Sequence, residues 1–304
     1  MPRTPGPSRL LADLAPVDRV HAAFYALVFA VATARVGVLP QPVATLGWFG
    51  GACLATLALA RRLRGRTGAP GVLPRAAFAL VTGPVTFLML GTVVPYANPW
   101  HAERFLHDVD TALFLGSNPN VLLDRIAWPP LTELLQIDYA LYYFMPVVLL
   151  GSFVLRRDWA GLGLGLFLAV LCLYASYLGY FLVPATGPNL NALGLYPPHF
   201  AEPMEGLWFA EPLRAALLEA EAIKHDCWPS GHAALTLTCL VIAHRTHRPT
   251  YRVLFVPVVL LVFSTMYLRY HYVIDVISGV ALAWAVLHFG PRWYDRARAP
   301  AVTA

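Results

Sequence analysis

The chain has 304 residues, of which 58% are hydrophobic and only 13% are charged, and its mean hydropathy is +0.58. One soluble core cannot bury so much apolar surface, so the composition excludes a soluble globular protein and predicts an all-helical, polytopic integral membrane protein. The net charge of +5 fits arginines that flank membrane helices, so we expect the bilayer and no nucleic acid as a partner.

Apolar runs of about 17–25 residues, the length of a helix that crosses a bilayer, predict eight membrane spans. The runs cover residues 21–39, 43–60, 76–96, 132–154, 160–183, 229–245, 251–268 and 272–290. The first run is longer than a signal-peptide core of about 7–15 residues, and no small-x-small cleavage pattern follows it. We therefore expect it to be retained as a helix.

The predicted spans divide the chain into four parts. We expect an N-terminal tail over 1–20, two membrane helices over 21–75, a six-helix membrane domain over 76–290 and a C-terminal tail over 291–304.

The basic residues predict the orientation of these helices. With the predicted spans, 16 of the 22 lysines and arginines fall on the side of the N-terminus. By the positive-inside rule this side is cytoplasmic, together with both termini. We expect a bacterial-type inner membrane.

Two long segments lie on the predicted outer side. The first, 97–131, ends at Pro129-Pro130, and we expect a short interfacial helix within it. The second, 184–228, contains an expected amphipathic helix from Pro212 to Lys224.

Two motifs near the C-terminus place a histidine at the outer mouth of a predicted helix. Cys-Trp-Pro-Ser-Gly-His occupies 227–232, and the first free N–H groups of the helix that starts there can hold a phosphate. Tyr-Leu-Arg-Tyr-His-Tyr-Val-Ile-Asp occupies 267–275, with His271 and Asp275 one helical turn apart. A carboxylate at that spacing can orient an imidazole and raise its nucleophilicity. The orientation places both histidines on the same side, so we predict one phosphoryl-transfer site.

Pro-Ser-Gly-His, followed about forty residues later by His-x-x-x-Asp, resembles the type 2 phosphatidic acid phosphatase superfamily. The resemblance implies that His271 attacks phosphorus and forms a phosphohistidine, that Asp275 orients it and that His232 protonates the leaving oxygen. It also implies that Ser230 and Gly231 contact phosphate. Since such a reaction depends on positioning and electrostatics, we expect no metal and no other cofactor.

The chain departs from the superfamily pattern at two places. Ser264-Thr265 stands where the superfamily usually has Ser-Arg, and the segment 183–189 carries no basic residue. The run Ser264-Thr265-Met266-Tyr267-Leu268, together with His271-Tyr272, Asp275 and Gly279, is similar to the inositol phosphorylceramide synthase branch, and sphingomyelin synthases share a similar His-Tyr-x-x-Asp core. These departures favour a headgroup phosphotransferase over a phosphatase and leave both open.

Other basic residues must then neutralise the phosphate. Among those on the outer side, Lys224 lies eight residues before His232 and Arg269 two residues before His271. We predict both as substrate-binding residues, although Arg269 would point away from His271 on a regular helix.

The remaining polar residues of the outer side are assigned structural roles. Asp108 and Asp110 are expected to be exposed or capping residues, the tyrosines at 139, 142 and 143 to serve packing, and His225 and Asp226 to be exposed loop residues. A metal site built on His271 and Asp275 is a further possibility, but no third outer ligand stands at a telling spacing.

The expected substrate is a lipid phosphate or a phospholipid that enters from the bilayer. The phosphoryl group passes either to water or to a lipid hydroxyl acceptor. Two alternatives stay open: a polyprenyl pyrophosphate phosphatase, and a non-enzymatic flippase or scaffold with the same fold.

Overall fold

The structure is a computed structural model that describes residues 14–220 and 224–298, and within these ranges it contains helices and no β-strand. The long helices are α2 (Pro16–Ala34), α3 (Pro42–Arg62), α4 (Gly68–Leu90), α8 (Pro129–Ala140), α9 (Met145–Leu155), α10 (Trp159–Leu182), α12 (Gly231–Thr246), α13 (Arg248–Tyr267) and α14 (Val273–Arg298). The short elements are η1 (Val36–Val38), α5 (Val94–Ala97), α6 (Glu103–Leu113), α7 (Pro119–Asp124), η2 (Leu141–Phe144), η3 (Pro188–Leu190), η4 (Pro198–Ala201) and α11 (Ala210–Ala220). The protein is a polytopic all-α membrane protein.

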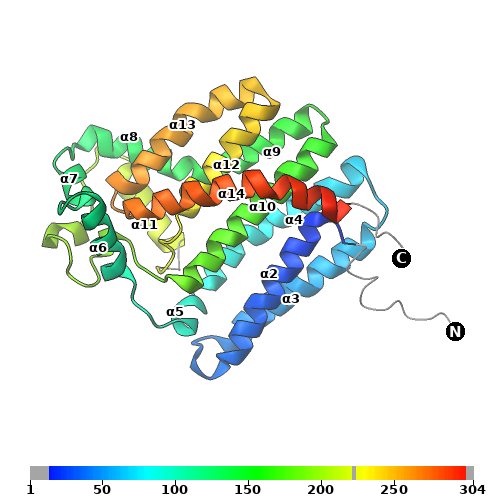
Figure 1. The fold of residues 1–304 in the computed structure, drawn as a ribbon, viewed down its shortest axis with the longest axis horizontal. Coiled ribbons are helices and arrows are strands. Elements are labelled where there is room, and N and C mark those ends of the chain that lie inside the picture. The colour runs from blue at the N-terminus through cyan, green and yellow to red at the C-terminus, as the bar shows by residue number, and fades with distance from the viewer. Residues whose placement is uncertain (1–13, 221–223, 299–304) are drawn as a thin grey trace.

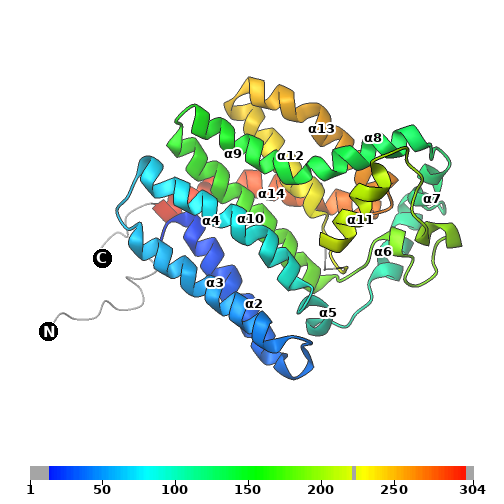
Figure 2. The same ribbon diagram turned by 180° about the vertical axis from the view of Figure 1, so that it is seen from behind.

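Seven helical segments in the described ranges are long and apolar enough to cross a membrane: α2, α3, α4, α8 joined through η2 to α9, α10, α13 and α14. The eighth expected span, 229–245, is the helix α12, whose 16 residues measure about 24 Å and fall short of a hydrocarbon core of about 30 Å. Because α12 packs against α9, α10, α13 and α14, other helices surround it in place of lipid. It is the central helix of the bundle (Figures 1 and 2).

Several helices extend beyond the apolar runs that predicted them. Helix α2 begins at Pro16, inside the expected N-terminal tail, because a proline suits the first turn and Asp18 accepts the backbone N–H of Ala15. Helix α14 continues to Arg298 through much of the expected C-terminal tail. The rest of the two expected tails, 1–13 and 299–304, lies outside the described residues.

Buried polar contacts attach the first helix, α2, to α4 and α10. Arg75 of α4 pairs with Asp18 of α2 at 2.8 Å. The hydroxyl of Tyr174 in α10 lies 2.8 Å from both His21 Nδ1 and the hydroxyl of Tyr25. These contacts satisfy polar groups that would be costly to leave unpaired in an apolar interior.

The short elements gather at one end of the molecule. Figure 1 shows α6, α7 and α11 at the end opposite the start of α2 and the end of α14. The segment 97–131 forms α6, α7 and the first residues of α8, where one short interfacial helix was expected, and the expected amphipathic helix is α11. Residues 221–223 of its expected range lie outside the described residues.

The segment before α11 is anchored to the bundle by one carboxylate. Glu133 of α8 accepts hydrogen bonds from the backbone N–H groups of Leu207, Trp208, Phe209 and Ala210 at 2.7–3.2 Å. This end therefore has a defined structure that can shape a site.

Candidate active site

The two histidine motifs meet at the end of the molecule that carries the short helices. His271 Nε2 lies 3.4 Å from His232 Nδ1, and His271 Nδ1 lies 3.4 Å from Asp275 Oδ2. His271 is 3% exposed, His232 8% and Asp275 0%. The three side chains thus form a continuous, buried row in which the central imidazole contacts an imidazole and a carboxylate.

A tight turn between α13 and α14 delivers His271. Arg269 has a φ of +64°, a left-handed conformation, and the N–H groups of Tyr270 and His271 both donate to the carbonyl of Thr265 at 3.0 and 2.9 Å. Asn120 of α7 donates to the carbonyl of His271 at 3.1 Å. The backbone at His271 is therefore held by both α13 and α7.

Helix α14 begins directly after this turn and positions Asp275. Asp275 Oδ2 accepts the backbone N–H of Tyr272 at 2.9 Å. Asp110 of α6 accepts the N–H groups of Val273 and Ile274 at 2.7 and 2.8 Å, so it caps α14 from a distant segment. The sequence allowed a capping role for Asp110 but did not indicate which helix it caps.

Ser230 and Gly231 start helix α12. Ser230 Oγ accepts the N–H of Ala233 at 3.3 Å, and the N–H of Ser230 donates to the carbonyl of Asp275 at 3.0 Å, which links the two motifs directly. The first N–H groups of a helix have no intrahelical partner. Those of Gly231 and His232 precede the capped Ala233, at the end of α12 that carries the His232 side chain.

Two glycines permit this close approach of the segments. A Cβ at Gly279 would lie 2.6 Å from the carbonyl oxygen of Ser230, and a Cβ at Gly187 would lie 2.6 Å from the carbonyl oxygen of Tyr270. Because both contacts are with backbone, a side chain at either position would push α14 or its preceding turn away.

A small polar pocket of about 40 Å³ opens onto His232 and His271. Its other lining residues are Tyr139, Gly187, Asn189, Leu190, Leu218, Lys224, Asp226, Cys227 and Tyr270. Lys224 therefore reaches the pocket, where its Nζ also donates to the carbonyl of Leu218 at 3.0 Å.

Arg269, by contrast, is directed away from the pocket. Its guanidinium pairs with Asp124, donates to the carbonyl of His199 at 3.0 Å and lies 4.1 Å from the centre of the Phe200 ring. The left-handed turn does not bring it toward His271, because Asp124 of α7 binds its charge. Burial raises the pKa of Asp124, but the hydrogen bonds from His199 and Arg269 outweigh burial and leave that pKa below its ordinary value.

A larger apolar cavity of about 420 Å³ reaches His232 from the other side. It lies between α4, α9, α10 and α12 and is lined by Ala79, Leu80, Gly83, Pro84, Phe87, Leu88, Tyr142, Tyr143, Pro146, Val147, Leu150, Leu166, Ala169, Val170, Leu173, Tyr177, Tyr180, Gly231, His232 and Leu235. His232 thus stands between a polar pocket and an apolar one. The arrangement suits an amphiphile with its polar part at the histidines.

Sequence reasoning did not identify several neighbours of the site. Tyr139 and Tyr142 lie with ring centroids 4.7 and 4.2 Å from that of His232, so tyrosines assigned to packing form its walls. Asn120 bonds to the carbonyl of His271 and Asp110 to the start of α14, each from more than 150 residues earlier in the chain. No local sequence pattern predicts contacts at such a separation.

In the structure, Cys227 lies where it could be a third metal ligand beside His271 and Asp275, a residue that the sequence pattern did not point to. One ligand atom from each of the three residues lies within 4.8 Å of the others. However, Cys227 Sγ donates to the carbonyl of Tyr270 at 3.3 Å, and burial raises the pKa of the thiol well above its ordinary value. Because this hydrogen bond joins Cys227 to the turn before α14, we assign Cys227 to packing.

The comparisons with known proteins identify the family. The family described as the PAP2 superfamily matches residues 104–289, more than half of the chain, including the segments that carry His232, His271 and Asp275. No match was found among curated proteins or among solved structures. The chain belongs to the PAP2 superfamily, the type 2 phosphatidic acid phosphatases, whose members have phosphatase-type or phosphotransferase-type activity.

Proposed function

We propose that the protein transfers a phosphoryl group, or a phosphorylated headgroup, from a membrane lipid through a covalent intermediate on His271. The observation that carries this proposal is the buried row formed by His232, His271 and Asp275, with its two 3.4 Å contacts. Asp275 holds the Nδ1–H side of His271 and leaves Nε2 as the nucleophile, directed toward His232.

The first half of the reaction forms the phosphohistidine. The Nε2 lone pair of His271 attacks phosphorus, the bond to the leaving oxygen breaks, and His232 gives that oxygen a proton. His232 Nε2 and Asp275 Oδ1 are buried atoms that have no hydrogen-bond partner within the described residues. Because His232, unlike Asp275, lines both pockets, its Nε2 can bond to substrate and acceptor oxygens.

The second half returns the enzyme to its starting state. Neutral His232 takes a proton from the acceptor, whose oxygen attacks phosphorus while the N–P bond to His271 breaks. The N–H groups of Gly231 and His232 and the ammonium group of Lys224 stabilise the negative charge on the phosphoryl oxygens in both steps. Ser230 contributes by capping α12 and so fixing these N–H groups.

The apolar cavity supports a lipid as the substrate. Its 420 Å³ extends from His232 between membrane helices, and the polar pocket adjoins the same residue. A hydrocarbon chain fits the first and a phosphorylated headgroup the second. We place this site on the outer side of a bacterial-type inner membrane, with the termini in the cytoplasm, as the arginine distribution indicates.

We favour transfer to a lipid hydroxyl over hydrolysis, as in the inositol phosphorylceramide synthase branch. Ser264 and Thr265 are fully buried, and their hydroxyls donate to the carbonyls of Leu261 and Val262. The positions that usually carry Ser-Arg therefore serve the end of α13 in this chain. A polyprenyl pyrophosphate is disfavoured because a more highly charged group would find few cations in this pocket.

The test is a product assay with purified protein in lipid micelles. Phosphatidic acid, a polyprenyl pyrophosphate, and phosphatidylinositol with ceramide or diacylglycerol are each offered, and products are identified by mass spectrometry with His271→Ala as the blank. A new phospholipid that forms only with the acceptor supports transfer, and His271-dependent free phosphate supports a phosphatase. Turnover that persists in His271→Ala rejects the proposal, and no turnover together with no phosphoenzyme favours the non-enzymatic alternative.

A further inference from the structure

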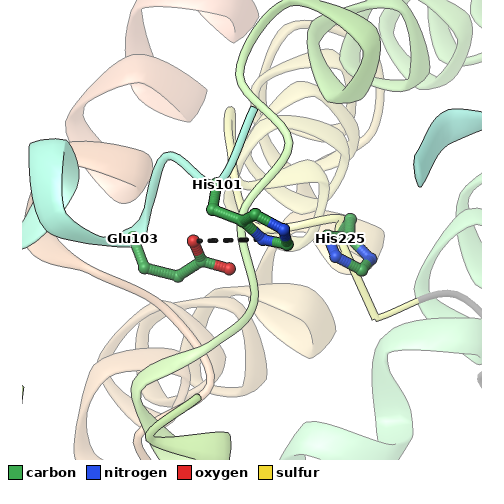
Figure 3. Close-up of side chains that lie close together, drawn as sticks. All are labelled: His101, Glu103 and His225. Atoms are coloured by element: carbon green, nitrogen blue, oxygen red, sulfur yellow. Dashed lines mark ion pairs between the residues drawn. The ribbon is translucent and has the colours of Figure 1, made fainter. Parts of the chain in front are cut away.

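A second cluster of ligand-type side chains lies at the same end of the molecule, outside the proposed catalytic row. His101, Glu103 and His225 each offer one ligand atom within 4.8 Å of the others. Figure 3 shows the His101 ring between the Glu103 carboxylate and the His225 ring. The ring centroids of the two histidines are 6.1 Å apart. Two imidazoles and one carboxylate thus converge from segments more than 120 residues apart.

Glu103 provides an independent sign that a ligand belongs here. Its side chain is 3% exposed, and Oε1 accepts hydrogen bonds from the N–H and the hydroxyl of Thr186 at 3.0 and 3.1 Å. Oε2 is buried without a hydrogen-bond partner within the described residues and lies 4.0 Å from His101 Nδ1. A buried carboxylate oxygen without a partner is costly, and a cation bound at Oε2 would remove that cost.

We propose that His101, Glu103 and His225 bind a zinc ion. Two histidines and a glutamate are a ligand set that zinc accepts, with a fourth tetrahedral position left for water. Adjacent ligand atoms of a tetrahedral zinc ion stand about 3.3 Å apart, slightly closer than the 4.0 Å between His101 and Glu103. The His101 side chain is 65% exposed, so a small rotation closes this difference.

Bound zinc would join three outer segments into one unit. His101 and Glu103 lie at the start of α6, Thr186 extends the connection to the segment that follows α10, and His225 lies in the segment that leads to α12. The residues next to His225, Lys224 and Asp226, line the polar pocket. Zinc therefore fixes one wall of that pocket and takes no part in the chemistry. Its binding can be measured whether or not the proposed function holds.

The test measures zinc binding to the full chain, purified in lipid nanodiscs, with any histidine tag removed and metal stripped by chelator. We expect one zinc ion per chain by titration calorimetry and elemental analysis. His225→Ala and Glu103→Gln should weaken binding beyond the factor of about 10 to 100 typical of substitutions outside the ligand shell. Thr186→Val, which removes one hydrogen bond to Glu103, should fall within that factor.

His107→Ala is the matched control. It removes another histidine of α6, which lies 3.2 Å from a carboxylate oxygen of Asp108 and outside the cluster, and zinc affinity should not change. Zinc should raise the melting temperature of the wild type and of His107→Ala, but not that of His225→Ala. This comparison also shows whether each variant is folded.

Three results would overturn the assignment: no zinc binding by the wild-type chain, unchanged affinity in folded His225→Ala, or a loss of binding in Cys227→Ser. The last result would move the metal to the Cys227, His271 and Asp275 group.

Discussion

At the scale of single residues, two adjacent histidines differ in their surroundings. His271 Nδ1 faces Asp275, whereas His232 Nδ1 faces His271 and its Nε2 has no hydrogen-bond partner within the described residues. In the proposed mechanism, the histidine held by a carboxylate is the nucleophile, and the one without a carboxylate partner exchanges protons with the substrate.

The first prediction separates these roles by leaving-group chemistry. His232→Ala should slow substrates with a poor, high-pKa leaving group by about 10²–10⁴-fold, the usual contribution of a general acid. It should slow substrates with a good leaving group, such as a nitrophenol, much less, because such oxygens leave without a proton. Steady-state rates over a series of leaving groups measure this, and an equal loss for every member would contradict the role of His232.

The second prediction concerns Asp110 and pH. Burial raises the pKa of Asp110 from 3.8 to about 6, although the N–H groups of Val273 and Ile274 partly offset that effect. Between pH 3.8 and about pH 6, Asp110 therefore carries a proton in a larger fraction of folded chains than of unfolded chains. The contribution of Asp110 to stability accordingly rises as the pH falls from about 7 toward 4.

Asp110→Asn should remove this contribution. For each protein, the melting temperature is measured at pH 5 and at pH 7. The value at pH 5 minus the value at pH 7 should be smaller for the variant than for the wild type. If the two proteins show the same difference, the raised pKa of Asp110 is refuted.

At the scale of elements, the junction of α12 with α14 determines whether the two motifs can meet. Ser230 and Asp275 are joined through their backbones at 3.0 Å, and Gly279 faces the carbonyl of Ser230. No side chain fits between the two helices at this point.

Gly279→Ala is therefore expected to destabilise the protein by about 1–3 kcal/mol, the usual cost of overpacking, and to reduce turnover. Gly51→Ala in α3 is the control, since a Cβ there meets nothing within 4 Å and alanine favours a helix. Thermal unfolding and product formation in the two variants provide the measurement. Equal behaviour of the two variants would show that the close approach of α14 to Ser230 is not required.

At the scale of the whole molecule, a helix from outside the matched family region contributes to the proposed lipid site. Helix α4 lies before the part of the chain that matches the PAP2 superfamily, yet it forms one wall of the apolar cavity at His232. The N-terminal part of this chain is thus placed to shape the binding of the hydrocarbon chain.

Ala79→Phe, which fills part of this cavity from α4, should raise the KM for long-chain lipid phosphates several-fold and leave short-chain, soluble analogues unaffected. Ala55→Phe adds the same ring to an exposed position of α3 and should change neither value. A loss that is the same for long and short chains would argue against a hydrocarbon chain in this cavity.

The parts of the structure that the sequence predicted are those with a local signature. Apolar runs gave the helices, and the placement of Pro-Ser-Gly-His and His-x-x-x-Asp on one side of the membrane anticipated that His232 and His271 would meet. Arg269 lay close to His271 in sequence, but its direction depends on Asp124, which is 145 residues away.

The same physical reason explains why the remaining contacts were not foreseen. Three contacts depend on how distant segments pack. They are the cap from Asp110 to α14, the hydrogen bonds from the segment before α11 to the Glu133 carboxylate, and the convergence of His101 with His225. His225, expected to be an exposed loop residue, is half-buried in the structure, where burial lowers its pKa.

A covalent intermediate on His271 can be detected by trapping the phosphorylated enzyme. The wild-type protein is mixed with its lipid substrate, quenched at alkaline pH because phosphohistidine is labile in acid, digested and mapped by tandem mass spectrometry. We expect phosphate, or the phosphorylated headgroup, on His271 of the wild type, and none on the His271→Ala variant. A modification on any other residue, or full turnover by His271→Ala, would contradict the proposed mechanism.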